Sequence, residues 1–238
     1  AHAQNISIGL VVCQQEDTLG VDTKTGLAKA EALMQNRLRQ KHLDNGVSMT
    51  APETVYFSYD TQIGPDSSIE PHCIFGVDVK IASEVTIKGF SHLEGVLAET
   101  GVQIGPYARL RQGTRLGAGA KIGNFVETKK AQIMEDAKVN HLSYIGDAYI
   151  GEGANIGAGT ITCNYDGYDK HLTEIGAGAF IGSNSSLIAP VKIGDGAYIG
   201  SSSSISGEIE AESLALTRAP LKEIEGWSVK FRMKKTKT

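Results

Sequence analysis

A six-residue periodicity of aliphatic and aromatic residues runs through most of the chain and constrains its fold more than any other feature. The repeated positions are Ile63, Ile69, Phe75, Ile81, Ile87, Ile104, Leu110, Leu116, Ile122, Ile133, Val139, Ile145, Ile150, Ile156, Ile175, Ile181, Leu187, Ile193, Ile199 and Ile205. A sustained hexapeptide repeat is typical of a parallel β-helix, in which three hexads form one triangular coil of about 18 residues. The sequence therefore predicts a mainly β solenoid, with about eight coils between residues 63 and 210 stacked at ~4.8 Å.

The small residues within each hexad agree with such close stacking. Most repeats carry a small or β-branched residue four positions after the aliphatic one, and glycine usually follows the aliphatic residue directly. The positions of the first kind are Ala108, Thr114, Ala120, Val126, Ser143, Ala154, Thr160, Ser185, Val191 and Ala197.

The segment before the repeat predicts two short elements of another kind. Residues 6–13, with the sequence ISIGLVVC, form a β-branched run that predicts a buried strand. Residues 21–43 predict a helix that Asp22 or Thr23 could cap. Its expected buried face consists of Leu27, Ala30, Met34 and Leu38. Turn residues within 45–52 mark the boundary between this helix and the repeat.

Charge and cysteine content limit the classes of partner. The formal net charge is −4, which gives no overall attraction to nucleic acid or to an anionic membrane. No apolar run approaches the ~20 residues of a transmembrane helix. Cys13, Cys73 and Cys163 lie far apart, and this pattern fits reduced thiols in a cytoplasmic protein better than a disulfide framework. We therefore expect neither a nucleic-acid partner nor a membrane partner.

His141 lies at a change of phase in the repeat. Ile122 and Val139 are 17 positions apart, which places Asn124 on the coil before His141 and Ala158 on the coil after it. A lone histidine is usually structural, but a neutral imidazole can take a proton from an attacking amine near neutral pH. The chain lacks the GxSxG, HExxH, paired-cysteine and P-loop patterns of other chemistries. His141 is the candidate base, and a purely structural role stays open.

Two further features suggest a binding site. Arg111 and Lys129 are 18 positions apart, so they stack on neighbouring coils and repel each other unless an anion lies between them. Spacing alone leaves open a second interpretation, in which both side chains extend into water. Ile156 and Ile175 are 19 positions apart, 13 more than one hexad. The inserted loop could carry binding groups or be a tolerated surface excursion.

Four segments, GPYARLRQG, KIGNFVETKK, NHLSYIGDAYIGEGANIGAGTITCNYDG and FIGSNSSLIAPV, carry a family resemblance. They closely resemble the C-terminal acetyltransferase domain of bacterial bifunctional N-acetylglucosamine-1-phosphate uridylyltransferase/glucosamine-1-phosphate N-acetyltransferases. The resemblance extends over residues 51–227 and implies a left-handed β-helix. It divides the chain into a uridylyltransferase remnant with its linker helix (1–50), the acetyltransferase β-helix (51–217) and a basic tail (218–238).

The resemblance also implies an activity, the acetyl-CoA-dependent N-acetylation of glucosamine-1-phosphate during UDP-N-acetylglucosamine biosynthesis. His141 would be the general base, Glu127 its partner, and the amine would attack acetyl-CoA directly. The implied substrate-binding positions are Arg111, Lys129, Tyr144, Asn155 and Lys170. The implied acetyl-CoA-binding positions are Ala158, Asn164, Tyr165, Ser183, Ser201 and Arg218. Ser201 stands where the family often has alanine.

The same resemblance implies a homotrimer with active sites between neighbouring subunits. Acetyl transfer would need no metal, whereas Mg²⁺ would serve the uridylyltransferase domain, in which Asp22 matches a metal ligand. The glycine-rich nucleotide loop of that domain is absent from the sequence, so we expect no uridylyltransferase activity from these 238 residues. Two alternatives remain, namely a hexapeptide acyltransferase with a different amino acceptor and a structural β-helix without activity.

Overall fold

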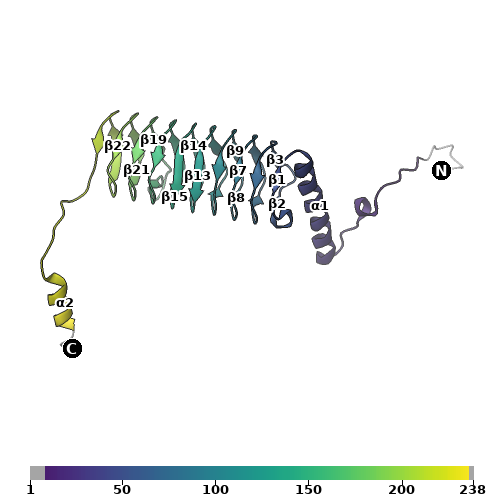
Figure 1. The fold of residues 1–238 in the computed structure, drawn as a ribbon, viewed down its shortest axis with the longest axis horizontal. Coiled ribbons are helices and arrows are strands. Elements are labelled where there is room, and N and C mark those ends of the chain that lie inside the picture. Colours follow the sequence, from purple (N-terminus) through teal and green to yellow (C-terminus); the bar gives the residue numbers. More distant parts are fainter. Residues whose placement is uncertain (1–8, 236–238) are drawn as a thin grey trace.

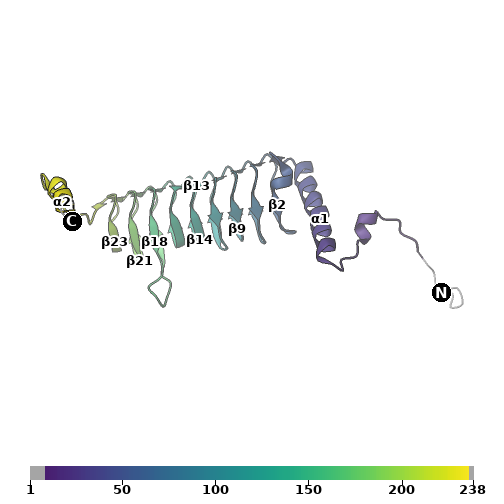
Figure 2. The same cartoon turned by 90° about the horizontal axis from the view of Figure 1, so that it is seen from below.

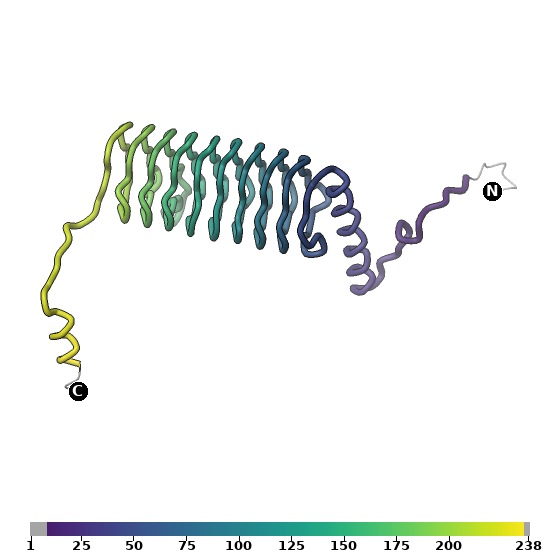
Figure 3. The backbone as a smooth tube through the Cα atoms, viewed as in Figure 1, coloured from purple at the N-terminus to yellow at the C-terminus, as the bar shows by residue number. Residues whose placement is uncertain are grey.

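The computed structural model describes residues 9–235, which form a row of stacked parallel coils with a helix near each end (Figure 1). The helical elements are the 3-10 helix η2 (Gln15–Thr18), α1 (Lys24–Asp44), the 3-10 helix η3 (Pro52–Thr54) and α2 (Trp227–Lys235). The backbone trace advances one coil at a time, so α1 and α2 lie at opposite ends of the solenoid (Figure 3). No helix of residues 9–235 has the length and apolar character to cross a membrane.

One face of the solenoid is a ten-stranded parallel sheet. Its strands are β1 (Ser48–Met49), β4 (Ser68–Ile69), β7 (Thr86–Ile87), β10 (Gln103–Ile104), β13 (Lys121–Asn124), β15 (Lys138–His141), β17 (Asn155–Ile156), β20 (Phe180–Ile181), β22 (Tyr198–Ile199) and β24 (Leu214–Ala215). Eight of these strands lie between residues 63 and 210, which confirms the expected number of coils.

The remaining strands join into one 14-stranded sheet that covers the other faces, because β14, β16 and β21 continue around a corner. Its strands are β2 (Tyr56–Phe57), β3 (Gln62–Ile63), β5 (Ile74–Phe75), β6 (Lys80–Ile81), β8 (His92–Leu93), β9 (Val96–Ala98), β11 (Arg109–Leu110), β12 (Thr114–Leu116), β14 (Glu127–Ile133), β16 (Tyr144–Ile150), β18 (Ile161–Cys163), β19 (Thr173–Ile175), β21 (Ser186–Ile193) and β23 (Ser204–Ile209). Its strand pairs are parallel, as a solenoid requires.

The repeated positions form the core, as the periodicity predicts. Every aliphatic or aromatic residue of the hexad pattern is buried, and so are the small residues that follow four positions later. Because burial of a Val, Leu or Ile side chain stabilises a fold by about 1.5–3 kcal/mol, this column of stacked side chains is the main source of stability. The mainly β class and the solenoid are confirmed, whereas the hand of the coil stays a prediction.

Helix α1 caps the N-terminal end of the solenoid, but not with the expected face. Thr23 is the N-cap, and its hydroxyl accepts a hydrogen bond from the backbone N–H of Gly26. The buried residues are Gln35, Leu38 and His42, whereas Leu27 and Met34 are exposed. The prediction is confirmed at Leu38, Ala30 is half-buried, and the prediction was wrong at Leu27 and Met34. The reason is that the helix covers an open strand edge, whose backbone groups need a polar partner.

Gln35 supplies that partner. Its Nε2 donates to the carbonyl of Phe57 at 2.8 Å, and its Oε1 accepts from the N–H of Phe57 at 2.9 Å. The side-chain amide thus replaces the coil that would otherwise precede β2. A glutamine in the middle of a helix gives no sequence signal for this role, which depends on the tertiary position of α1.

The strand expected over residues 6–13 does not form in its described part. Residues 9–13 have no regular secondary structure, and Leu10, Val11 and Val12 are exposed. Residues 6–8 lie outside the described residues. A β-branched run forms a stable strand only when a neighbouring strand accepts its hydrogen bonds, and none pairs with residues 9–13. The three cysteines are free thiols, in agreement with the expected reduced state.

Candidate functional site

A column of aligned residues runs along one corner of the solenoid and contains His141. Asn124 in β13 pairs with His141 in β15, so the predicted 17-residue step is confirmed. The next coils continue the column through Ala158 and Ser183, because backbone hydrogen bonds join His141 O to Gly159 N and Ala158 O to Asn184 N. Ser201 follows through the bond from Ser202 N to Ser183 O.

The imidazole of His141 has a defined partner on the preceding coil. Its Nδ1 lies 2.6 Å from the side-chain oxygen of Asn124, and the His141 side chain is otherwise exposed. Because a carbonyl oxygen can only accept, this contact favours the tautomer with the proton on Nδ1. The lone pair of the neutral ring is then on Nε2, where it could accept a proton from a bound amine.

Glycines next to this column leave no room for a side chain between consecutive coils. A side chain at Gly157 would bring its Cβ to 2.6 Å from the N–H of Ser183, and one at Gly182 would clash with Ser201. Consecutive coils therefore approach each other closely beside Ala158, Ser183 and Ser201. An elongated molecule could lie along this wall, over the exposed side chains of Ser183 and Ser201.

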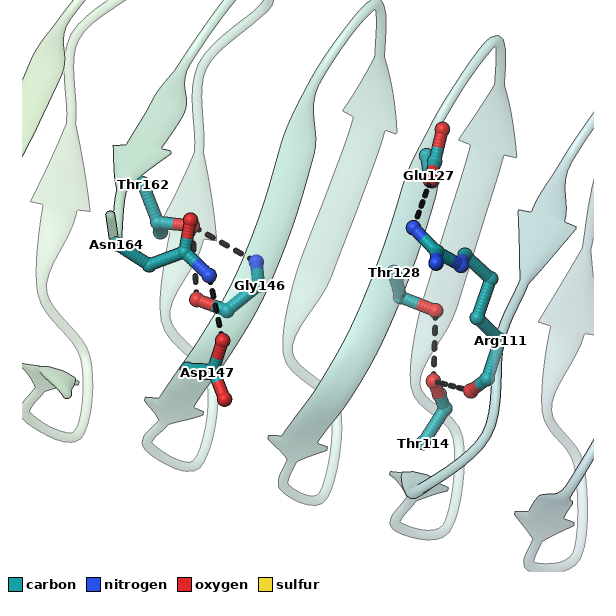
Figure 4. Close-up of polar contacts among 8 residues, drawn as sticks. All are labelled: Arg111, Thr114, Glu127, Thr128, Gly146, Asp147, Thr162 and Asn164. Carbon is teal, nitrogen blue, oxygen red and sulfur yellow. Dashed lines mark hydrogen bonds and ion pairs between the residues drawn. The ribbon is translucent and has the colours of Figure 1, made fainter. Parts of the chain in front are cut away.

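Arg111, Lys129 and Lys170 form a cationic cluster on the neighbouring face. Arg111 Nη1 donates to Glu127 Oε1 at 2.8 Å (Figure 4). The ammonium group of Lys170 lies beside that of Lys129 and is the largest cause that lowers the pKa of Lys129, with Arg111 adding to the repulsion. Three cations held together in this way are typical of an anion-binding site.

The inserted loop brings Lys170 to this cluster. The loop leaves the solenoid after β18 and projects from the row of coils (Figure 2). An antiparallel bridge between Tyr165 and Lys170 closes it. Within it, Asp166 accepts hydrogen bonds at 2.8 Å from the N–H groups of Tyr168 and Asp169, and from His171 Nε2 at 2.8 Å. These contacts hold the pKa of Asp166 well below its usual range, with the His171 contact as the largest cause.

At the base of the loop, Thr162 and Asn164 bond to β16. The Thr162 hydroxyl lies 2.8 Å from Gly146 N and 3.0 Å from Gly146 O, and Asn164 Nδ2 donates to Asp147 Oδ2 at 2.5 Å (Figure 4). Thr162 and Asn164 are both buried. A Cβ at Gly146 would clash with the hydroxyl of Tyr144, so this glycine makes room for the tyrosine ring.

The other expected site residues are distributed along the same coils. Asn155 is half-buried in β17 and pairs with Lys138 and Phe180. Tyr165, Ser183, Ser201 and Arg218 are exposed. The Arg218 guanidinium lies close to Gly200, so it extends the column towards the C-terminal end.

The contact of Glu127 differs from the expected one. Its carboxylate bonds to Arg111, while the described hydrogen bond of the imidazole is to Asn124. A role of Glu127 towards His141 therefore stays a prediction. Asp22 is exposed, and no group of three His, Cys, Asp or Glu side chains in residues 9–235 is arranged to hold a metal ion.

Comparison with known proteins agrees with this architecture. Residues 172–207 match the family described as bacterial transferase hexapeptide (six repeats). The chain is 56% identical to Bifunctional protein GlmU of Azorhizobium caulinodans over 98% of its length and 52% of that protein. It matches one half of Bifunctional protein GlmU. This confirms the resemblance found in the sequence.

A second GlmU, that of Paramagnetospirillum magneticum, is 52% identical over the same shares of the two chains. The chain thus spans about half the length of the curated relatives it matches. Among solved structures, the UDP-N-acetylglucosamine O-acyltransferase LpxA from Moraxella catarrhalis is 15% identical, with a TM-score of 0.47 over 77% of this chain and 76% of that chain.

Three site features were not predicted from the sequence, namely Thr162, Asp147 and the Asp166–His171 pair. For Asp147 a signal existed, because Asp147 and Asn164 are 17 positions apart, the same step that relates Asn124 to His141. The Asp166–His171 pair depends on the fold of the loop, for which the repeat gives no register.

Proposed function

We propose that this chain transfers the acetyl group of acetyl-CoA to the 2-amino group of glucosamine-1-phosphate. The observation that carries the proposal is the convergence of Arg111, Lys129 and Lys170, which repel each other strongly enough to lower the pKa of Lys129. A dianionic phosphate would relieve that repulsion. The identity to GlmU over nearly the whole chain supports the same acceptor.

In the proposed reaction His141 acts as general base. The amine nitrogen attacks the thioester carbonyl carbon, a C–N bond forms, and Nε2 of His141 takes a proton from the nitrogen. The C–S bond then breaks, and the CoA thiolate leaves and receives that proton. The hydrogen bond from Nδ1 to Asn124 supports this role, because it keeps the lone pair on Nε2 and stabilises the imidazolium as it forms.

The remaining residues would hold the two substrates. Arg111, Lys129 and Lys170 bind the phosphate, while Tyr144 and Asn155 contact the sugar. The acetyl-CoA chain lies along the column of small residues, and the residues proposed to contact it are Ala158, Asn164, Tyr165, Ser183, Ser201 and Arg218. The exposed side chains of Ser183 and Ser201 on this wall support this path.

We further propose a cytoplasmic homotrimer in which a neighbouring subunit closes each site. His141, Ser183, Ser201 and Arg218 are exposed in the single chain, so a second copy would supply the missing wall. Desolvation by that wall would strengthen the phosphate contacts. Multi-angle light scattering should give three times the mass of the chain; a monomer with full activity would contradict this arrangement.

The experiment for the activity is a thiol-release assay with acetyl-CoA and a panel of acceptors. Glucosamine-1-phosphate should react, glucosamine without the phosphate should react poorly, and an amino acid should not react. Equal rates with phosphorylated and unphosphorylated sugars would favour a transferase with a different acceptor. Release of no thiol with any acceptor would favour a structural β-helix.

A further inference from the structure

Asp147 lies between Asn164 at the base of the inserted loop and the cationic cluster that contains Lys129. It follows Gly146 in β16, and Gly146 is aligned with Lys129 on the preceding coil. Its φ of 46° lies in the left-handed region, as does that of Lys130 (φ 45°), the aligned residue of the preceding coil. The sequence-based roles described above do not include this residue.

The carboxylate of Asp147 holds Asn164. The 2.5 Å hydrogen bond from Asn164 Nδ2 to Asp147 Oδ2 joins a side chain that is only 6% exposed to one that is half-buried (Figure 4). An asparagine amide can present either its oxygen or its nitrogen to a ligand. Because the nitrogen is engaged by the carboxylate, the orientation of the amide is fixed.

The same carboxylate is carried by the residue after Gly146, which is aligned with Lys129 of the cationic cluster. Its charge raises the pKa of Lys129, in opposition to Lys170 and Arg111, which lower it. Glu127, a second acidic residue next to this cluster, bonds to Arg111. Asp147 is therefore the carboxylate that counteracts the repulsion on Lys129 from the side of the inserted loop.

We propose that Asp147 is a positioning residue that fixes the amide of Asn164 for the acetyl donor and keeps Lys129 ready for the sugar phosphate. The inference rests on the proposed acetyltransferase function. Asp147 does not contact the reacting atoms, but its single carboxylate aligns the groups that bind both substrates. Two different changes at this position should therefore separate its two effects.

Asp147→Asn keeps an oxygen acceptor for Asn164 but removes the charge, whereas Asp147→Ala removes both. We expect Asp147→Ala to raise the KM for acetyl-CoA or lower kcat by about tenfold, as loss of an orienting partner commonly does, and Asp147→Asn to change them less than threefold, roughly. In both variants, Lys129 should lose its proton at lower pH. The alkaline rise in the KM for glucosamine-1-phosphate should then move to lower pH.

Asp136→Asn is the matched control, since Asp136 is also left-handed (φ 54°) and is not part of the proposed site. It should leave both KM values and the pH profile unchanged. Thermal unfolding of each variant identifies simple loss of the fold, and NMR titration of labelled Lys129 reports its pKa without any turnover.

Wild-type protein without acetyl transfer would overturn the proposed function, whereas an unshifted Lys129 pKa in both variants would overturn the charge role of Asp147. An active protein in which Asp147→Ala retains the wild-type kcat and acetyl-CoA KM would overturn its role towards Asn164.

Discussion

The hydroxyl group of Thr162 satisfies the backbone of β16 where the inserted loop leaves the solenoid, so its removal should lower the free energy of unfolding. In a regular coil, the N–H and C=O of Gly146 would bond to the backbone of the next coil. The loop interrupts that pairing, and both groups bond instead to the Thr162 side chain, at 2.8 and 3.0 Å. Thr162 is 1% exposed, so water cannot easily replace it.

Thr162→Val keeps the shape of the side chain and leaves two buried backbone groups without partners. Each such group costs about 1–3 kcal/mol, and partial relaxation reduces the sum to roughly 2–4 kcal/mol. For a chain of this size, 1 kcal/mol corresponds to about 2–4 °C, so the thermal midpoint should fall by roughly 5–15 °C. The opening free energy that hydrogen exchange reports for the Gly146 amide should fall by a similar amount. Because Gly146 precedes Asp147, acetyl transfer should also slow.

Thr128→Val is the matched control, since Thr128 is equally buried. Its hydroxyl bonds to the Thr114 hydroxyl at 2.9 Å, but Thr114 also bonds to the carbonyl of Arg111, so no group at Thr114 is left without a partner. We expect a loss of at most about 1 kcal/mol. Equal destabilisation by the two changes would refute the assignment of the Gly146 backbone to Thr162.

Three further outcomes are expected. Gln35→Leu should lower the free energy of unfolding by roughly 2–4 kcal/mol in a denaturant titration, because both backbone groups of Phe57 lose their partner; the exposed neighbour change Gln40→Leu should have little effect, and the reverse order would contradict the capping role of α1. Lys170→Gln should raise the pKa of Lys129, measured by the pH dependence of amine labelling. Because the pKa of Lys129 is lowered by folding, the folded protein binds the Lys129 proton less tightly than the unfolded chain does. The free energy of unfolding of the wild type should therefore rise with pH up to about 10.5, and a Lys170→Gln variant that keeps this rise would refute the repulsion between Lys170 and Lys129. The wild type gains stability from ionised Asp166 above pH 3.8, the ordinary aspartate pKa, and loses it as the pH falls through the lower pKa that Asp166 has in the folded protein. Asp166→Asn should remove this gain, and identical acid unfolding curves of wild type and variant would contradict the contribution of this carboxylate.

The solenoid could be predicted from the sequence because its core is a strict repeat. Spacing alone fixes which residues stack, so the alignment of Asn124 with His141 follows from a step of 17 residues. The column of glycines and small residues follows from the same arithmetic. Each coil contacts only its neighbours, which makes local sequence sufficient for the fold.

The errors arise where the repeat ends or is interrupted. The buried face of α1 includes Gln35 and His42 because the helix meets an open strand edge, a contact that helical periodicity does not report. Residues 9–13 have strand-like composition but no strand to pair with. The contacts of Asp147 and Thr162 depend on how the inserted loop returns to the coil. The assigned roles of the site residues rest on the family resemblance, and geometry adds the Asn124 contact and the cationic cluster.

The most direct test of the proposed mechanism is the turnover of His141→Ala with acetyl-CoA and saturating glucosamine-1-phosphate. Removal of the general base should lower kcat by about 10²-fold or more, with an unchanged thermal midpoint. His92→Ala, a change of another exposed histidine on the solenoid surface, should retain wild-type turnover. Wild-type turnover in His141→Ala would contradict the account of this site as an acetyltransferase centre with His141 as its base.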